Sequence, residues 1–347
     1  KTLFPYTTLF RSRALMKLLP QLSLITLQAL SLLTCSLTYS QSSAPYPTRP
    51  VTLVVPFAPG GGTDIGARLI ADKLTRKWGQ SVVVDNKGGA GGVLGADIVA
   101  KAKADGYTLL FGNVGTQSIN PALYKKLPYN PETAFAPVSL VAELPFMLMA
   151  SPSFAPKTVK ELVAYAKANP DKVTYASSGN GGSPHLSAEV FAAMAGIKMT
   201  HVPYKGGGPA MNDLMAGHVN ILFASVLESI GSIQAGKLNA LAVTTKTRSS
   251  TAPNVPTIAE SGADSGLAGY ESGSWIGILA PAGTPQSIVS KIAADVKEAM
   301  ADAATRDAFA KQGANPVGST PAQFKALIDA DWKRYAKIID EKKISID

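Results

Sequence analysis

The chain has 347 residues, of which 46% are hydrophobic and 16% charged, enough apolar material for two buried cores. Basic residues exceed acidic ones by nine, but residues 1–42 hold four basic and no acidic side chains, so 29 basic and 24 acidic residues remain beyond them, spread along the chain. This pattern excludes a nucleic-acid-binding stripe, and a single cysteine, Cys35, excludes disulfides and cysteine metal sites from the mature chain.

The N-terminal residues are interpreted as foreign and targeting sequence. Thr2–Ser12 looks like a translated sequencing adapter, so residues 1–15 are set aside. Residues 16–42, with one lysine, a Leu-rich apolar stretch and a small, polar end, predict a secretory signal peptide and a periplasmic location. A membrane anchor is the alternative, weakened by polar residues within the stretch. Lipidation at Cys35 is a third reading, with Thr34 where a smaller residue is usual.

After the signal peptide, strands and helices alternate with short connections. This order predicts a βαβαβ unit with a mostly parallel sheet covered on both faces. Ligands bind such sheets beyond the carboxyl ends of the strands. The predicted strands are 51–56, 81–85 and 107–112, and the predicted helices are 64–78 and 94–102.

The first strand is followed by three glycines, Gly60, Gly61 and Gly62, and then by a helix. Glycines in this position expose backbone N–H groups where the helix dipole also favours negative charge, which predicts an anion-binding loop. The loop lacks the Lys-Ser/Thr pair of nucleotide triphosphate loops. Thr63 or Asp64 is available as helix cap, and Asp64 is interpreted either as a first-turn acid or as a contact for a ligand ammonium or an ordered water.

A second alternation of strands and helices follows an irregular stretch at 120–137. Segments 138–141 and 145–150 are interpreted as the crossing into a second lobe, and 275–279 as part of the return, so that paired strands form a hinge. The chain then ends in helices that begin at Pro285 and Pro321, capped by Thr284 and Thr320. The predicted lobes are 43–143 plus 274–347 (lobe 1) and 144–273 (lobe 2). Lobe 2 is predicted to hold helices 159–168, 184–195, 209–216 and 226–235 and strands 173–176, 198–202, 221–224 and 240–243.

Two more glycine-rich stretches open helices in the second lobe. Residues 177–184 follow one strand, and residues 201–210 end the next strand and open a helix. Lys205 is interpreted either as a pocket cation or as a solvated side chain. Anion-binding loops in both halves of the chain indicate one ligand held between two lobes.

Residues for catalysis are missing from the sequence. Ser183 and His185 are too close together to be taken as a dyad, and no Gly-x-Ser-x-Gly elbow occurs. His185, His201 and His218 lack metal-ligand spacing and are interpreted as packing or surface residues. We therefore expect a binding protein with no catalytic residue, no metal and no cofactor.

Five motifs in combination resemble the Bug family of periplasmic solute receptors of tripartite tricarboxylate transporters. The resemblance covers residues 46–347. The motifs are Tyr46–Val51, Val55–Asp64, Pro203–Gly206, Asp213–Val219 and Trp275–Pro285. The resemblance implies a type II periplasmic-binding-protein fold. In this α/β fold, two lobes close on a small carboxylate, which loop backbone and ordered waters hold.

The resemblance also implies a set of ligand contacts and partners. The partners are a small carboxylate and the large and small membrane subunits of the transporter, with the receptor itself a monomer that binds no nucleic acid. The alternatives are a periplasmic sensor that reports to a membrane signalling partner and a serine hydrolase acting through Ser183. The implied ligand contacts are Phe57, Gly60, Gly61, Gly62, Thr63, Asp64, Asn113, Ser178, Gly179, Gly182, Tyr204 and Asp213, the last binding water or capping the closing helix.

Overall fold

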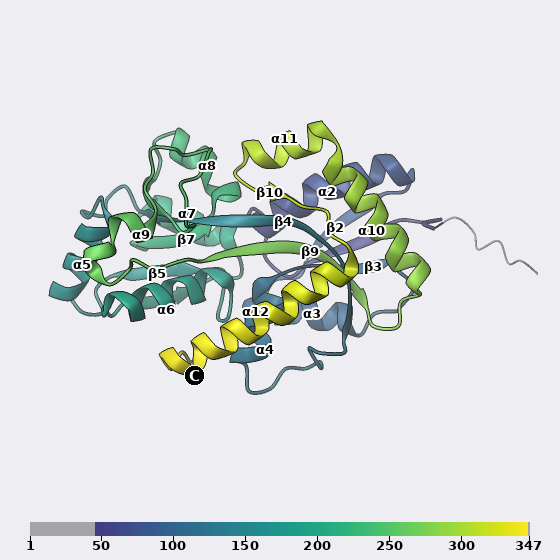
Figure 1. The fold of residues 1–347 in the computed structure, drawn as a ribbon, viewed down its shortest axis with the longest axis horizontal. Coiled ribbons are helices and arrows are strands. Elements are labelled where there is room, and N and C mark those ends of the chain that lie inside the picture. Colours follow the sequence, from purple (N-terminus) through teal and green to yellow (C-terminus); the bar gives the residue numbers. More distant parts are fainter. Residues whose placement is uncertain (1–45, 346–347) are drawn as a thin grey trace, which may run out of the picture. The chain divides into compact units, whose positions relative to one another are not determined.

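The computed structural model describes residues 46–345. The adapter-like segment, the predicted signal peptide and its anchor and lipidation alternatives lie outside the described residues. From Pro47 on, the chain forms one compact unit whose strands build a single sheet (Figure 1). Within the described part of the chain, no helix has both the length and the apolar character that crossing a membrane requires.

The first part of the sheet contains the predicted βαβαβ unit. Its central strand pairs in parallel with both neighbours, so that Leu53 lies opposite Val84 on one side and Leu109 on the other. The strand is buried because helices cover both faces of the sheet. The elements are β1 (Val51–Val55), α2 (Gly62–Trp78), β2 (Val82–Asn86), η1 (Ala90–Gly92), α3 (Val93–Ala100) and β3 (Thr108–Asn113).

The second part of the sheet repeats this arrangement. A central strand again pairs in parallel with two neighbours, and helices lie on both faces (Figure 1). The elements are α5 (Val159–Ala168), β5 (Thr174–Ser177), α6 (Ser183–Ala195), β6 (Thr200–Pro203), α7 (Gly207–Ala216), β7 (Ile221–Ser225), α8 (Val226–Gln234), β8 (Asn239–Val243), α9 (Ile258–Ser261) and η3 (Ala263–Ser265).

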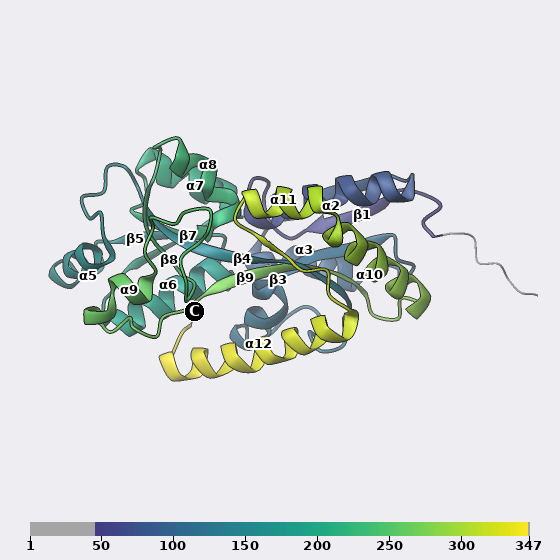
Figure 2. The ribbon, with the colours of Figure 1, turned by 45° about the horizontal axis from the view of Figure 1, so that its top comes forward.

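Two antiparallel strands, β4 (Phe135–Ala150) and β9 (Gly273–Pro281), connect the two parts. β4 pairs with β9 from Phe135 to Pro145 and then, beyond Pro145, with β7 and β8 (Figure 2). The parallel pairing expected for the βαβαβ unit is confirmed, whereas the two crossing strands are antiparallel, because a chain that crosses over and returns brings them together in opposite directions. The two segments predicted on either side of 142–144 are one strand, in which Pro137 lies at a register shift.

Alternation along β4 and β7 divides the core of the second part between two faces of the sheet. Successive side chains of a strand point to opposite faces. Phe146 and Leu148 therefore pack with Phe223 against α5, α6 and α9, whereas Met147 and Met149 pack against α7 and α8. The hydrophobic pattern of two strands thus positions five helices and the loops before them.

The C-terminal part covers the first half of the sheet on both faces. It contains α10 (Gln286–Ala301), α11 (Ala303–Lys311), β10 (Asn315–Pro316) and α12 (Pro321–Lys342). α10 and α11 lie on the α2 side, and α12 on the side of α4 (Asn120–Leu123) (Figures 1 and 2). Thr320 caps α12 as predicted, with Gln323 completing the capping box.

Two predicted helix caps are wrong. Thr284 does not cap α10, because its hydroxyl donates to the Pro281 carbonyl and the helix begins after Pro285. Neither Thr63 nor Asp64 caps α2, whose N-cap is Gly61. Two elements carry no prediction from the sequence: the π-helix η2 (Gly115–Ile119) after β3, and the helix α11.

Candidate functional site

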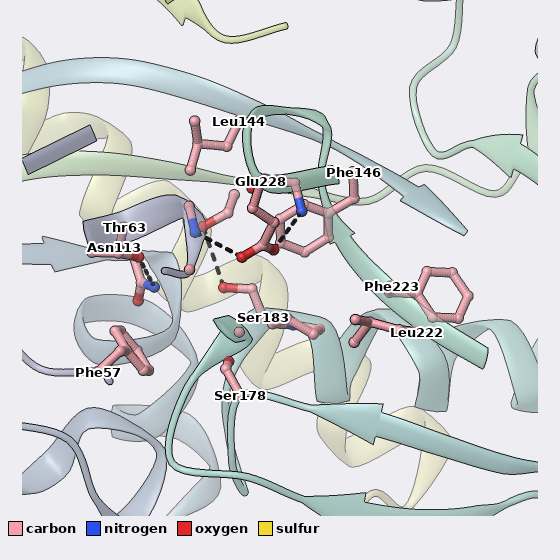
Figure 3. Close-up of a pocket in the computed structure, with 16 residues that line it drawn as sticks. Phe57, Thr63, Asn113, Leu144, Phe146, Ser178, Ser183, Leu222, Phe223 and Glu228 are labelled. Atoms are coloured by element: carbon pink, nitrogen blue, oxygen red, sulfur yellow. Dashed lines mark hydrogen bonds between the residues drawn. The ribbon is translucent and has the colours of Figure 1, made fainter. Parts of the chain in front are cut away.

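A small cavity lies where glycine-rich loops from the two parts of the sheet meet (Figure 3). Its volume of about 40 Å³ accommodates a few water molecules, so the cleft around it is closed in this structure. Among the lining residues, all within the described part of the chain, Glu228 alone has an ionisable side chain. The lining consists of Phe57, Gly61, Gly62, Thr63, Asn113, Leu144, Phe146, Ser178, Ser183, Pro184, Gly207, Leu222, Phe223, Ser225, Glu228 and Ser274.

A larger hollow of about 530 Å³ lies beside α12, between Phe135, Ile328 and Trp332. None of the residues that line it belongs to the glycine-rich loops. The smaller cavity is the better candidate because backbone N–H groups at the starts of α2, α6 and α7 converge on it.

The start of α2 forms the first wall of the cavity. Gly60 has φ +86°, a left-handed conformation that glycine adopts without strain, and the chain then enters the helix at Gly62 with no side-chain cap. The N–H groups of the first turn are therefore left for acceptors from elsewhere. Asn113, at the end of β3, donates to Thr63 Oγ1 at 3.2 Å and joins the neighbouring strand to this turn.

Asp64 lies behind this wall and holds the loop in place. Its carboxylate accepts from Gly60 N at 2.9 Å, from Asn86 Nδ2 at 3.0 Å and from Arg68 Nε at 3.1 Å. Burial by itself raises the pKa of Asp64, but the hydrogen bonds from Arg68, Gly60 and Asn86 outweigh it and leave the pKa below its ordinary value. Of the two interpretations of Asp64, the structure therefore favours a structural one, with the first-turn acid turned back toward the glycine loop.

Asp64→Ala is expected to lower the free energy of unfolding by about 2–4 kcal/mol, because the Gly60 N–H and the Asn86 amide lose a buried acceptor. The ion pair with Arg68 adds little to this value, since the Arg68 side chain is 55% exposed. Chemical unfolding checks the value. Asp72→Ala is the matched control on the same helix: its ion pair with Arg76 is exposed, so the expected loss stays below about 1 kcal/mol. Equal losses in the two variants would contradict the role given to Asp64.

The start of α6 forms the opposite wall. Gly182 precedes the helix, Pro184 occupies its first turn, and Ser178 and Ser183 line the cavity. Ser183 is buried, and its hydroxyl lies 3.3 Å from that of Ser274. A serine nucleophile needs a base within hydrogen-bond reach. The nearby His185 instead accepts from Gly181 N through Nδ1, which gives no support to the serine hydrolase alternative.

A stack of three rings supports this wall from behind. His201 lies between Tyr175 and His185, with its ring centroid 4.8 Å from that of Tyr175 and 4.2 Å from that of His185. His201 Nε2 and Ser177 Oγ are 2.6 Å apart, and Ser177 Oγ in turn accepts from Gly179 N. The histidines thus pack under the loop, as expected from their spacing. In the residues that the structure describes, no three His, Cys, Asp or Glu side chains are grouped to hold a metal ion.

Glu228 reaches across the cavity from α8 to the start of α2, a contact that sequence reasoning did not anticipate. Oε2 accepts from Gly62 N at 2.7 Å, and Oε1 accepts from Ser225 N at 2.9 Å (Figure 3). Burial raises the pKa of Glu228 above its ordinary value, and the hydrogen bonds from Ser225 and Gly62 offset part of that rise. The sequence pattern Ser225-x-x-Glu228 signals a capping box, but it does not signal the contact with Gly62.

The twelve predicted contacts fall into two groups. Phe57, Gly61, Gly62, Thr63, Asn113 and Ser178 line the cavity, whereas Gly60, Asp64, Gly179, Gly182, Tyr204 and Asp213 do not. In this second group, the Tyr204 hydroxyl donates to Asp213 at 2.6 Å, and burial raises the pKa of Tyr204 to about 12. Lys205 is exposed and does not line the cavity. Contact of any of these residues with a ligand stays a prediction.

Comparison with known proteins shows similarity along most of the chain. Residues 66–344 match the TctC model, described as the tripartite tricarboxylate transporter family receptor. BugT of Bordetella pertussis is 37% identical over 301 residues, which cover 86% of this chain and 91% of BugT.

Two solved structures are similar over nearly their full length. Rpa4515 of R. palustris, solved with adipate, has a TM-score of 0.83 at 38% identity. The match covers 86% of this chain and 99% of the Rpa4515 chain. MatC from Rhodopseudomonas palustris, with bound malate, has a TM-score of 0.80 at 35% identity. The match covers 85% of this chain and 100% of the MatC chain. The α/β fold of type II periplasmic binding proteins, expected from the resemblance, is confirmed.

Proposed function

Because the chain belongs to the family of tripartite tricarboxylate transporter receptors, we propose that it captures a small carboxylate between its two lobes and delivers it to a membrane transporter. The family is one of solute receptors and not of enzymes. The observation that carries the proposal is the convergence of the starts of α2, α6 and α7 on one cavity. Helix starts offer backbone N–H groups and a favourable dipole to an anion.

The ligand class follows from the same geometry and from relatives. Within residues 46–345, no lysine, arginine or histidine lines the cavity, so a carboxylate is held by N–H, hydroxyl and amide donors such as Thr63, Asn113 and Ser183. Charge-assisted hydrogen bonds contribute about 1.5–3 kcal/mol each, and several of them suffice for micromolar affinity. The adipate of Rpa4515 and the malate of MatC support a small carboxylic acid as the ligand here.

The mechanism is closure of the lobes around the ligand. β4 and β9 cross between them and form the hinge, with the change of pairing partner beyond Pro145 as the point of bending. A ligand that contacts both walls does so only in the closed state and shifts the population toward it. The closed receptor is then recognised by the large and small membrane subunits, with the receptor acting as a periplasmic monomer.

A thermal-shift screen of the chain starting at Ser43, with mono-, di- and tricarboxylates, amino acids and aromatic acids, tests this proposal. A ligand at a hundred times its Kd stabilises the receptor by about 2.7 kcal/mol, which gives a saturable rise in Tm. If none of these acids shifts the Tm, the proposal fails.

Gly61→Val is expected to weaken binding of the acid found in that screen by about a hundredfold or more. A Cβ at Gly61 lies 3.1 Å from Gly207 N and 3.3 Å from Glu228 Oε2, so the valine methyl groups fill the cavity. Gly61 has φ −84°, which valine also adopts, so the change does not strain the backbone. Gly269→Val, with nothing within 4 Å of its Cβ, is the control that calorimetric titration should find unchanged. Equal affinity of both variants would place the ligand elsewhere.

A further inference from the structure

We propose that Glu228 determines ligand specificity by filling one of the anion positions of the cleft with the receptor's own carboxylate. The receptor then favours acids that present a neutral hydrogen-bond donor or an ammonium group to Glu228 over acids with a second carboxylate there. This inference rests on the proposed function. It specifies in addition which end of the ligand is a carboxylate and which end is a neutral donor or an ammonium group.

The first support is the position of the Glu228 carboxylate. Oε2 accepts from Gly62 N at 2.7 Å, and it lies 3.3 Å and 2.3 Å from the Cβ positions that alanine would have at Gly61 and Gly207. Glu228 is therefore packed against the glycines that open α2 and α7. These glycines are the donors that an incoming carboxylate at this wall needs.

The second support is the charge of the cavity. Glu228 is the ionisable side chain of the lining set, and the N–H groups of Gly62 and Ser225 both donate to its carboxyl group, which favours the charged form against the effect of burial. The Asp64 carboxylate is held on the far side of the loop by Gly60, Asn86 and Arg68. A second carboxylate beside Glu228 meets a like charge with no cation in the lining to offset it, and like charges at close range in a poorly hydrated site repel strongly. An amide or ammonium group in the same place donates to the carboxylate instead.

The third support is that the opposite wall stays available for the ligand carboxylate. Ser178, Ser183 and the start of α6 face the cavity from the opposite wall, and Asn113 and Thr63 face it from the α2 side. The apolar side chains Leu144, Phe146 and Leu222 lie between β4, β7 and the loops (Figure 3). A ligand thus binds with its carboxylate toward α6 and its other end toward Glu228.

The experiment compares each dicarboxylate with its monoamide, which has the same shape and one charge fewer. The probes are adipate and adipate monoamide, and succinate and succinamate, which match the chain lengths of the adipate and malate bound by relatives. Calorimetric titration at pH 7.5 is expected to show wild-type protein binding the monoamide of at least one pair about tenfold more tightly than the diacid. In Glu228→Gln, the ratio is expected to fall by about tenfold or to invert.

Glutamine at position 228 should preserve the fold. The side-chain oxygen of Gln323 accepts from Thr320 N in the capping box of α12, which shows that glutamine performs this capping in the same chain. Glu260→Gln is the matched control: Glu260 occupies the equivalent capping-box position on α9, accepts from Thr257 N and does not line the cavity. It should leave the ratio unchanged.

Two results overturn the inference while leaving the proposed function intact. One is that wild-type protein binds carboxylates but prefers the diacids. The other is that Glu228→Gln tightens both members of a pair equally, which means that the Glu228 carboxylate is displaced by the ligand rather than retained. If no carboxylic acid of any class binds to either protein, the proposed function fails and this inference fails with it.

Discussion

Gly91→Ala is expected to weaken ligand binding by about a hundredfold or more while leaving the protein folded, because it holds the two lobes apart. Gly91 lies between β2 and α3, and a Cβ there would be 1.8 Å from the carbonyl oxygen of Asn180, between β5 and α6. The clash is with backbone, which a change of rotamer cannot relieve. Tyr124 marks the same contact, since its hydroxyl is within hydrogen-bond distance of the Ala90 and Asn180 carbonyls.

The loss of affinity follows from the closure mechanism. If the loops cannot approach, the ligand contacts one wall of the cleft and loses the hydrogen bonds of the other. Calorimetric titration with the acid found by screening measures this loss, and far-UV circular dichroism checks the fold.

The control is Gly196→Ala, which separates backbone strain from the clash. Gly196 has φ +63° and Gly91 has φ +60°, so alanine strains both to a similar degree, but nothing lies within 4 Å of the Gly196 Cβ. Affinity should be unchanged in this control. If Gly91→Ala binds as tightly as Gly196→Ala, contact between these loops is not needed for binding and the closure mechanism is wrong.

The second large effect is a loss of stability in mild acid caused by the buried histidines. Burial, together with the neighbouring His201, lowers the pKa of His185 to about 3, and burial lowers the pKa of His201 to about 4. Both pKa values lie below the unfolded value of about 6.5. Between these pH values the unfolded chain therefore binds more protons at the two histidines than the folded chain does. The stability they provide is fully present above pH 6.5 and is lost as the pH falls through about 4 and then about 3.

The free energy of unfolding is expected to depend steeply on pH. Between about pH 6 and pH 4, the free energy of unfolding should fall by up to about 1.4 kcal/mol per pH unit for each histidine. Of the carboxylates nearby, Glu189 lies 3.9 Å from His185 Nε2 and hydrogen-bonds to the Tyr175 hydroxyl. Glu228, whose pKa is raised, acts in the opposite direction, because protonation of a group with a raised pKa stabilises the folded state.

Urea unfolding at a series of pH values measures this slope. His185→Asn keeps an acceptor near Gly181 N and removes one proton-binding site, so its slope should be shallower than that of wild-type protein even if its absolute stability is lower. His218→Asn is the control, because it makes the same replacement at a histidine whose side chain is 68% exposed. Identical slopes for wild type and His185→Asn would show that the buried histidines do not titrate on unfolding.

Prediction from the sequence succeeded where the signal was local. The helix Val159–Ala168 was predicted with its exact bounds, because Thr158 accepts from Glu161 N and an apolar stripe follows. It failed where a neighbour decided the conformation. Thr284 precedes a proline as a capping residue does, but its hydroxyl is taken by the Pro281 carbonyl at the end of β9.

The candidate site divides in the same way. Three consecutive glycines between a strand and a helix predict a loop of free N–H groups, a signal that lies in neighbouring residues of the sequence. The structure places two of these glycines, Gly61 and Gly62, at the cavity. The aromatic and serine residues contributed by β4, β7 and β9 carry no such signal, because their position depends on how the crossing strands pair.

The sequence by itself determined the alternation of strands and helices, the glycine-rich loops at the helix starts and the family, because each of these depends on residues close together in the chain. Only the tertiary structure decided what faces the first loop. Gly62 and Glu228 are 166 residues apart, and their hydrogen bond exists because β4 and β9 bring the starts of α2 and α8 together. The sequence pattern of a capping box is the same whether the second carboxylate oxygen of its glutamate contacts water or another helix. Burial and long-range contacts are properties of the folded chain and do not appear in that pattern.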